Sequence, residues 1–342
     1  TDSASGVASI WYRYRDGDGP WSSWAQGTSF TLDAEGRYSI QHYAVDVACR
    51  REAPRDMEGS VDIDLSAPVT TYTVDGTAGR NGWYISTPIR VTLVPTDTAS
   101  GVQETKYRLS GETTWRTWNG TPILLSGEGL RTIEYYSVDR AGNREETRQA
   151  QIGIDITAPP LPGLPQVSPT GWTNRNDFTL SWTNPFDTSG VAGAYYKLDD
   201  EPLSGNDYTG VCTATHVITR CFGIQVPEGR HGVYVWLVDI AGNADYTTRK
   251  YRPNLMSYDS VAPQTQITVT GVQSGMWYRS PVTMTFTATD PLPPGVNEAS
   301  GVRVISYSVG CGPVWQAGNQ VVIEAEGRTT VCYRATDYAG NV

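Results

Sequence analysis

Short segments in which apolar and polar residues alternate run through this chain. Within residues 66–157 they are Pro88–Thr96, Val102–Leu109 and Leu130–Asp139, all rich in Val, Ile, Thr and Tyr. Gly, Pro, Asn and Asp cluster between these segments and predict turns. No stretch carries an apolar stripe of helical period over the length of a helix. The pattern therefore predicts an all-β fold.

The same pattern occurs four times along the chain. Asp139–Asn143 (Asp-Arg-Ala-Gly-Asn) recurs as Asp239–Asn243 and Asp337–Asn341, and in degenerate form as Asp46–Arg50. A Glu-Gly pair begins 11 residues before each of these aspartates, and a Ser-Gly-Val triplet lies upstream of each pair. Elements repeated in a fixed order predict tandem domains. We expect four repeats, at residues 1–65, 66–157, 158–261 and 262–342.

Seven short strands, named A to G, are expected in the second repeat. They are Val69–Val74, Ile89–Thr96, Val102–Leu109, a short middle strand at Trp115–Trp118, Ile123–Ser126, Leu130–Asp139 and Glu145–Asp155. Strand candidates spaced about 8–12 residues apart, in repeats of this length, predict an immunoglobulin-like sandwich. On strand F, the alternating Ile133, Tyr135 and Ser137 are expected to face the core.

Four motifs of the second repeat carry a family resemblance. They are Asn81-Gly-Trp-Tyr84, Thr96-Asp97-x-x-Ser-Gly-Val102, Trp115-x-x-Trp118 and Asp139-x-Ala-Gly-Asn143. Together they resemble the bacterial immunoglobulin-like repeats of large secreted and cell-surface proteins. The resemblance covers the whole chain. It implies exported sandwiches used in tandem as a stalk, adhesin shaft or surface-layer module, or as an accessory module of a secreted hydrolase.

The two outer repeats are expected to be partial. The first begins at the loop between strands B and C, and the fourth ends at Val342 before strand G. Missing strands would expose sheet edges and core, which predicts that the native chain continues in both directions. A competing hypothesis is that a neighbouring subunit donates the missing strands.

The five cysteines favour an oxidising compartment. Cys212 and Cys221 flank a short segment and could staple a hairpin, while Cys311 follows strand C and Cys332 lies on strand F of the fourth repeat. Two disulfides would fit an extracellular or cell-surface protein. The alternative is a set of free buried thiols. Cys49 is left unpaired, in a turn expected to be exposed.

Composition and motifs exclude several classes of function. The net charge of −10 disfavours nucleic acid as a partner, and no run approaches the about 18 apolar residues of a membrane span. The chain contains no His-Glu-x-x-His, Gly-x-Ser-x-Gly or phosphate-loop motif, and its three histidines share no visible nucleophile. We therefore predict that the chain is not an enzyme.

The repeated aspartates allow two interpretations. Each aspartate at the end of strand F can accept backbone N–H groups of the turn that follows, and Gly and Asn tolerate the positive φ of such turns. The turn residues concerned are Gly142, Asn143, Gly242, Asn243, Gly340 and Asn341. This first interpretation gives the aspartates a structural role alone.

The second interpretation is calcium binding, and no other cofactor is expected. In a sandwich, the B–C and F–G loops lie at one pole with the start of strand A, so three aspartates should meet there in each repeat. The expected sets are Asp64, Asp97 and Asp139; Asp155, Asp187 and Asp239; and Asp259, Asp290 and Asp337. Carboxylate oxygens suit Ca²⁺, which takes about six to eight oxygen ligands.

Two functions follow as hypotheses. The first is a structural, non-catalytic segment of a long extracellular repeat protein: a stalk, adhesin shaft, surface layer or filament. Its partners would be further repeats of the same longer chain, or copies of itself in a surface assembly. The second is a glycan-binding accessory module of a secreted hydrolase, because Trp21, Trp24, Trp115 and Trp118 could stack on sugars. The other interpretation of these rings is core packing.

Overall fold

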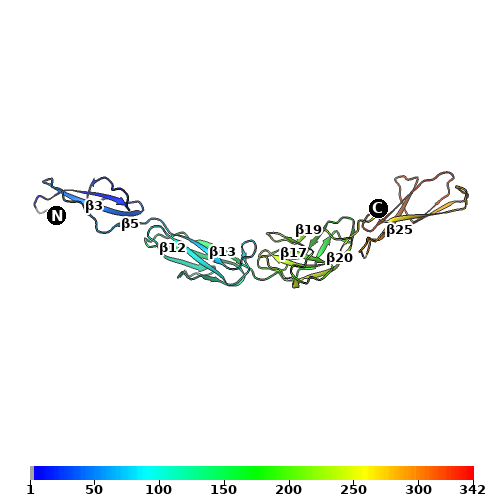
Figure 1. Ribbon diagram of the computed structural model, residues 1–342, viewed down its shortest axis with the longest axis horizontal. Coiled ribbons are helices and arrows are strands. Elements are labelled where there is room, and N and C mark those ends of the chain that lie inside the picture. Colours follow the sequence, from blue (N-terminus) through cyan, green and yellow to red (C-terminus); the bar gives the residue numbers. More distant parts are fainter. Residues whose placement is uncertain (1–3, 297) are drawn as a thin grey trace. The chain divides into compact units, whose positions relative to one another are not determined.

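The structure is a computed structural model that describes residues 4–296 and 298–342 (Figure 1). Every regular element in these ranges is a β-strand, apart from one short 3-10 helix, η1 (Tyr246–Thr248). The all-β prediction is therefore confirmed. No helix of the described residues is long and apolar enough to cross a membrane. The chain divides into two compact units, Thr1–Thr77 with Ser86–Ile154, and Ala78–Ile85 with Asp155–Val342.

The second repeat forms two facing sheets within the first unit. One sheet has the strand order β11-β8-β6, and the other contains β10-β9-β12-β13. The bounds are β6 (Val69–Asp75), β8 (Ile89–Thr96), β9 (Val102–Leu109), β10 (Arg116–Thr117), β11 (Ile123–Leu125), β12 (Gly129–Asp139) and β13 (Arg148–Ile154). The strands predicted as B and C match β8 and β9. The division of the whole chain into four repeats stays a prediction. The names first to fourth repeat denote the predicted ranges 1–65, 66–157, 158–261 and 262–342.

The inner faces of these two sheets form the core of the second repeat. Ile89 and Val91 of β8 are fully buried, and so is Ile133 of β12. Tyr135 packs edge-on against Tyr72 of the opposite sheet, with ring centroids 6.2 Å apart. Because alternate residues of a strand point to opposite faces, this burial confirms the expected inward face of strand F.

The third repeat contains a buried hydrophobic cluster. Its sheets have the orders β14-β16-β19 and β15-β21-β20-β17-β18. The bounds are β14 (Gln166–Ser168), β15 (Trp172–Thr173), β16 (Phe178–Ser181), β17 (Val191–Leu198), β18 (Gly210–Thr213), β19 (Arg220–Ile224), β20 (Gly229–Asp239) and β21 (Lys250–Tyr258). Phe178 and Leu180 pack against Val233, Val235 and Leu237, and all five are fully buried.

The fourth repeat also forms two three-stranded sheets, with the orders β22-β25-β28 and β27-β26-β29, and a separate pair β23-β24. The bounds are β22 (Gln264–Thr270), β23 (Gln273–Ser274), β24 (Trp277–Tyr278), β25 (Val282–Thr289), β26 (Val302–Val309), β27 (Gln316–Ala317), β28 (Gln320–Ile323) and β29 (Val331–Asp337). Phe286 is buried between Tyr307 and Tyr333 of the facing sheet.

The described part of the first repeat is one sheet of order β2-β1-β3-β4, with β5 also paired to β3. The bounds are β1 (Val7–Asp16), β2 (Ala25–Gln26), β3 (Gly36–Asp46), β4 (Arg55–Asp56) and β5 (Val61–Ile63). The residues that correspond to Ile133, Tyr135 and Ser137 are Ile40, His42 and Ala44. None of these three is buried, so this sheet presents an open apolar face.

Both expected disulfides are formed. Cys311, in the turn after β26, is bonded to Cys332 of β29. Cys212 is bonded to Cys221, but these residues do not staple a hairpin as expected, because β18 and β19 belong to opposite sheets. This disulfide therefore cross-links the two layers of the third repeat. Cys49 is a free, exposed thiol.

Three of the four paired tryptophans, Trp21, Trp24 and Trp115, stack with arginines. The Arg13 guanidinium lies 4.7 Å from the ring centroids of both Trp21 and Trp24. Arg108 lies 4.6 Å from the ring of Trp115, which packs edge-on against Tyr136. The four paired tryptophan rings are only half-buried. None of them belongs to the fully buried core of the described residues.

Replacing Arg108 by Gln is expected to destabilise the second repeat by about 1 kcal/mol, because the change removes the stacking on Trp115 and the ion pair with Glu134. Calorimetry should record a fall of about 5 °C in the melting temperature of that repeat. The control is Arg90→Gln, since Arg90 is exposed and its nitrogen lies 3.8 Å from Asp75. Equal losses in the two variants would contradict a stabilising role for the stack.

Candidate metal centres

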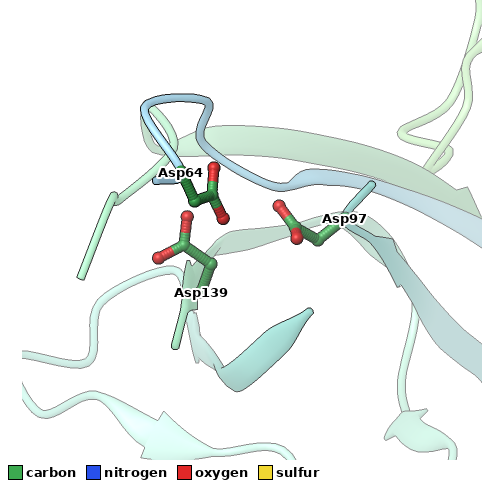
Figure 2. Close-up of side chains that lie close together, drawn as sticks. All are labelled: Asp64, Asp97 and Asp139. Atoms are coloured by element: carbon green, nitrogen blue, oxygen red, sulfur yellow. The ribbon is translucent and has the colours of Figure 1, made fainter. Parts of the chain in front are cut away.

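Three clusters of aspartates match the sets expected from the sequence. In each set, one carboxylate oxygen per residue lies within 4.8 Å of the oxygens of the other two. Figure 2 shows the first cluster, in which the carboxylates of Asp64, Asp97 and Asp139 face a common space. The second cluster joins Asp155, Asp187 and Asp239, and the third joins Asp259, Asp290 and Asp337. Whether these clusters bind calcium stays a prediction.

The strands bring the three carboxylates of a cluster to one end of a sandwich. In the first cluster, Asp97 follows β8, Asp139 is the last residue of β12, and Asp64 follows β5 in the linker before β6. Asp139 is paired with Val102 at the start of β9, so the loop from Asp97 to Gly101 lies beside it. The cluster therefore contains one linker residue and two residues of the repeat that follows.

The turn after strand F forms as the first interpretation expected. Asp139 Oδ1 accepts the backbone N–H of Asn143 at 2.8 Å, and Oδ2 accepts the Asn143 side-chain amide at 2.8 Å. Asp239 and Asp337 make the same two bonds with Asn243 and Asn341. The intervening glycine has a φ of 95° in the second repeat, a conformation that favours glycine. A carboxylate has lone pairs beyond these bonds, so the two interpretations are compatible.

The asparagine of this turn also holds the linker. The side-chain amide of Asn143 donates to the backbone carbonyl of Asp64 at 3.0 Å. Asn243 donates to the carbonyl of Asp155 at 2.9 Å, and Asn341 to that of Asp259 at 2.8 Å. The repeated asparagine was expected only to tolerate the turn. Its contact with the linker was missed, because it joins residues 79 or more positions apart.

The Ser-Gly-Val triplets complete the clusters. The backbone N–H of Ser100 donates to Asp64 Oδ2 at 2.9 Å, and that of Gly101 donates to Asp97 Oδ1 at 2.6 Å. The corresponding serines and glycines of the next two repeats make the same contacts. The triplet was recognised in the sequence as a repeated motif without a role. Its role is to orient the linker aspartate and the loop aspartate toward each other.

A glutamate fixes the linker from the side of the preceding repeat. In the first unit, Ser66 Oγ donates to Glu35 Oε2 at 2.5 Å. In the second unit, the backbone N–H of Ser260 donates to Glu228 Oε2 at 3.1 Å. Ser66 directly precedes the Ala67-Pro68 pair, and Ser260 directly follows the linker residue Asp259. The linker is therefore bonded to the preceding repeat as well as to the repeat that follows. The Glu-Gly pairs were recognised as markers, and this contact was missed.

Burial makes the clustered negative charge costly. Asp155 and Asp337 are fully buried, and Asp239 is only 1% exposed. Burial, and to a smaller extent the nearby Asp155 and Asp239 carboxylates, raise the pKa of Asp187 to about 6. Burial likewise raises the pKa of Asp239 to about 6. Three carboxylates this close favour either a shared proton or a bound cation.

The pKa shifts differ between the other two clusters. Hydrogen bonding from Ser100 lowers the pKa of Asp64 in the first cluster. Burial raises the pKa of Asp290 in the third cluster, and Asp259 and Asp337 add to this rise. Asp290 Oδ1 is buried without a hydrogen-bond partner among the described residues. An unpaired buried acceptor beside two carboxylates is a group that a bound cation would satisfy.

The first repeat lacks a described cluster of this kind. Asp2, which precedes its Ser-Gly-Val triplet, lies outside the described residues. Asp46 Oδ1 accepts the backbone N–H of Arg50 at 2.7 Å, so its turn resembles the others, but Arg50 replaces the asparagine that would hold a linker. Asp18 lies in the turn that follows β1 and is exposed, as expected for a hairpin turn.

Comparisons with known proteins show likenesses of structure alone. No family model and no curated protein matches the chain. The fibronectin(III)-like modules of Clostridium thermocellum CbhA share 12% identity over 55% of this chain and 95% of theirs, with a TM-score of 0.29. A tetra-tandem repeat in the extending region of a large adhesion protein shares 16% identity over 100% of this chain and 90% of that chain, with a TM-score of 0.28. The FN1–FN3 domains of chicken CNTN1 share 14% identity over 75% of this chain and 91% of theirs, with a TM-score of 0.27.

Proposed function

We propose that this chain is a non-catalytic structural segment of a long extracellular repeat protein, such as a stalk, adhesin shaft, surface layer or filament. In this proposal, calcium ions in the aspartate clusters fasten each linker to the repeat that follows it. The observation that carries the proposal is the threefold recurrence of one cluster, built each time from a linker aspartate and two loop aspartates. An identical site in successive domains suits a mechanical role, since catalysis needs only one centre.

The ligand atoms favour calcium among the common cations. Each cluster offers carboxylate oxygens from three residues, and neither His nor Cys belongs to any of the three. Zinc prefers nitrogen and sulfur ligands, whereas Ca²⁺ takes oxygen ligands in a flexible geometry. A bound Ca²⁺ would also offset the negative charge that burial makes costly. The residues present therefore fit a calcium ion.

Two disulfides support the proposed location outside the cell, because they persist in oxidising compartments. The proposed partners are further repeats of the same longer chain, or copies of the chain in a surface assembly. The glycan-binding alternative finds no comparable support, since Trp21, Trp24 and Trp115 are stacked with arginines.

Calorimetric titration of the metal-free chain tests the proposal. We expect three calcium ions to bind, one for each cluster. Asp187→Asn should reduce the number to two, because it removes one negative ligand from the second cluster. Asp18→Asn, at an exposed aspartate of a turn, should leave the number at three. Binding that is absent, or that persists unchanged in the Asp187 variant, would refute the proposal.

A further inference from the structure

The loop between β6 and β8 contacts a turn of the third repeat. The segment Ala78–Ile85, which includes β7 (Trp83–Tyr84), belongs to the second compact unit. The backbone N–H of Arg80 donates to the carbonyl of Ala241 at 2.7 Å. The side-chain amide of Asn81 donates to the carbonyl of Ile240 at 2.9 Å. Both acceptors lie in the turn Asp239–Asn243, so the loop makes two directed hydrogen bonds to it.

The loop and the turn fit closely. A Cβ atom added at Gly79 would lie 2.5 Å from the carbonyl oxygen of Ala241, and one added at Gly242 would lie 3.0 Å from Cδ of Arg80. Ala241 is only 1% exposed. Among its counterparts in turns of the same type, Ala48 and Ala141 are exposed and Ala339 is half-buried. Ala241, in the turn on which the loop is seated, is the most buried of the four.

The loop is shaped for this contact by its own hydrogen bonds. The backbone N–H of Gly79 donates to the carbonyl of Trp83 at 2.8 Å, and that of Trp83 donates to the carbonyl of Arg80 at 3.0 Å. Asn81 has a φ of 52°, a left-handed conformation that Asn adopts more readily than most residues. A loop that is already ordered loses less entropy when it docks.

The same turn forms one wall of the second aspartate cluster. The N–H groups of Gly242 and Asn243 donate to Asp239 Oδ1 at 2.5 and 2.8 Å, while the carbonyls of Ile240 and Ala241 accept from the loop. Arg80, Asn81 and Asp239 also line one hollow of about 390 Å³. The turn is thus hydrogen-bonded both to the loop and to the cluster.

We infer that Gly79–Asn81 is a docking element whose partner is the Asp-x-Ala-Gly-Asn turn of the repeat that follows in the chain, and that a cation in the cluster beneath this turn strengthens the docking. The second half of this inference rests on the proposed function. A cation would hold Asp239 in place, and with it the N–H groups of the turn. The turn carbonyls would then be ordered before the loop binds them, which lowers the cost of docking.

Hydrogen exchange of the Arg80 amide in the full chain tests both halves. This amide donates to Ala241 only while the loop is docked, so its protection measures docking. With calcium we expect exchange at least about tenfold slower than in an unstructured peptide, and faster exchange after removal of calcium with a chelator. Asn81→Gly keeps the left-handed backbone and removes one hydrogen bond, so protection should fall about fivefold.

The matched control is Asn254→Gly. Asn254 is exposed and has a φ of 51°, so this variant makes the same change at an equivalent backbone conformation away from the loop. It should leave Arg80 protected and calcium binding intact. The same protection in the Asn81 and Asn254 variants would contradict the role of the Asn81 side chain.

Three outcomes separate this inference from the proposed function. An Arg80 amide that exchanges at the unstructured rate in calcium would overturn the docking element. Equal protection with calcium and with chelator, in a chain whose titration shows bound calcium, would overturn the coupling. Protection of Arg80 in a chain that binds no calcium would support docking and refute the calcium clusters.

Discussion

Calcium is expected to raise the melting temperature of the third repeat by about 10–20 °C, and Asp187→Asn is expected to abolish this gain. A ligand that binds only the folded state, at a free concentration about 100 times its Kd, stabilises that state by about 2.7 kcal/mol. For a domain of about 100 residues, each kcal/mol corresponds to a shift of about 4–8 °C. Differential scanning calorimetry of the full chain measures the shift.

The behaviour of the variant without calcium is equally diagnostic. An asparagine at 187 still offers an acceptor to the backbone N–H of Gly190, which now donates to Asp187 Oδ1 at 2.8 Å. It also removes one of three clustered negative charges. In chelator, the Asp187→Asn chain should therefore be at least as stable as the parent. In calcium, the parent should be the more stable of the two.

Asp18→Asn serves as the control for the loss of one carboxylate. Asp18 is exposed and belongs to none of the three clusters, so this variant should gain as much from calcium as the parent does. If the Asp187 variant also kept the full gain, calcium would be acting elsewhere. If the variant were strongly destabilised in chelator, the carboxylate would have a structural role that the cluster geometry does not explain.

The stability of the third repeat should respond to pH in opposite directions with and without calcium. An aspartate of an unfolded chain titrates near pH 3.9, whereas the pKa values of Asp187 and Asp239 are raised to about 6. Between these values the folded chain binds more protons than the unfolded chain. Without metal, the repeat should therefore gain stability as the pH is lowered from about 7 to about 5.

The expected gain is on the order of 2 kcal/mol. A shift of about two pKa units corresponds to nearly 3 kcal/mol for one buried group, and the partial exposure of Asp187 and the mutual coupling of the carboxylates reduce the total. The contribution is complete below the unfolded pKa and is lost as the pH rises through about 6. Asp187→Asn should flatten this dependence.

With calcium the sign reverses, because protons compete with the metal for the same oxygens. Acidification from about pH 7 to about pH 5 should then destabilise the third repeat. Calorimetry at both pH values, with metal-free and calcium-loaded chain, gives the four melting temperatures needed. Parallel pH dependences in the two states would show that the cation and the protons do not share these carboxylates.

Much of the fold was predictable from the sequence. Strands β8 and β9 were predicted with their bounds, and the inward face of β12 followed from alternation at Ile133, Tyr135 and Ser137. These are short-range properties, because the residues of one strand determine which of its faces is apolar. The aspartate sets were predictable for a related reason, since repetition identified equivalent positions and the sandwich topology brought them to one pole.

Several contacts were not predictable in the same way. The Cys212–Cys221 bond joins two sheets rather than two strands of one hairpin, and sequence separation alone does not distinguish these cases. The short strand β15 pairs in parallel with the end of β21, where Trp172 lies opposite Ser257. No local signal marks such a pairing, because it depends on where the last strand of the sandwich ends.

What the sequence determined by itself is the type and order of the strands of the second repeat and the membership of the three aspartate clusters. Only the tertiary structure decided that Asn143 holds the linker at Asp64, and that Asn81 reaches Ile240 from 159 positions away. Alternation and turn chemistry act over a few residues, whereas these hydrogen bonds exist only after separate loops have been brought together by the packed sheets.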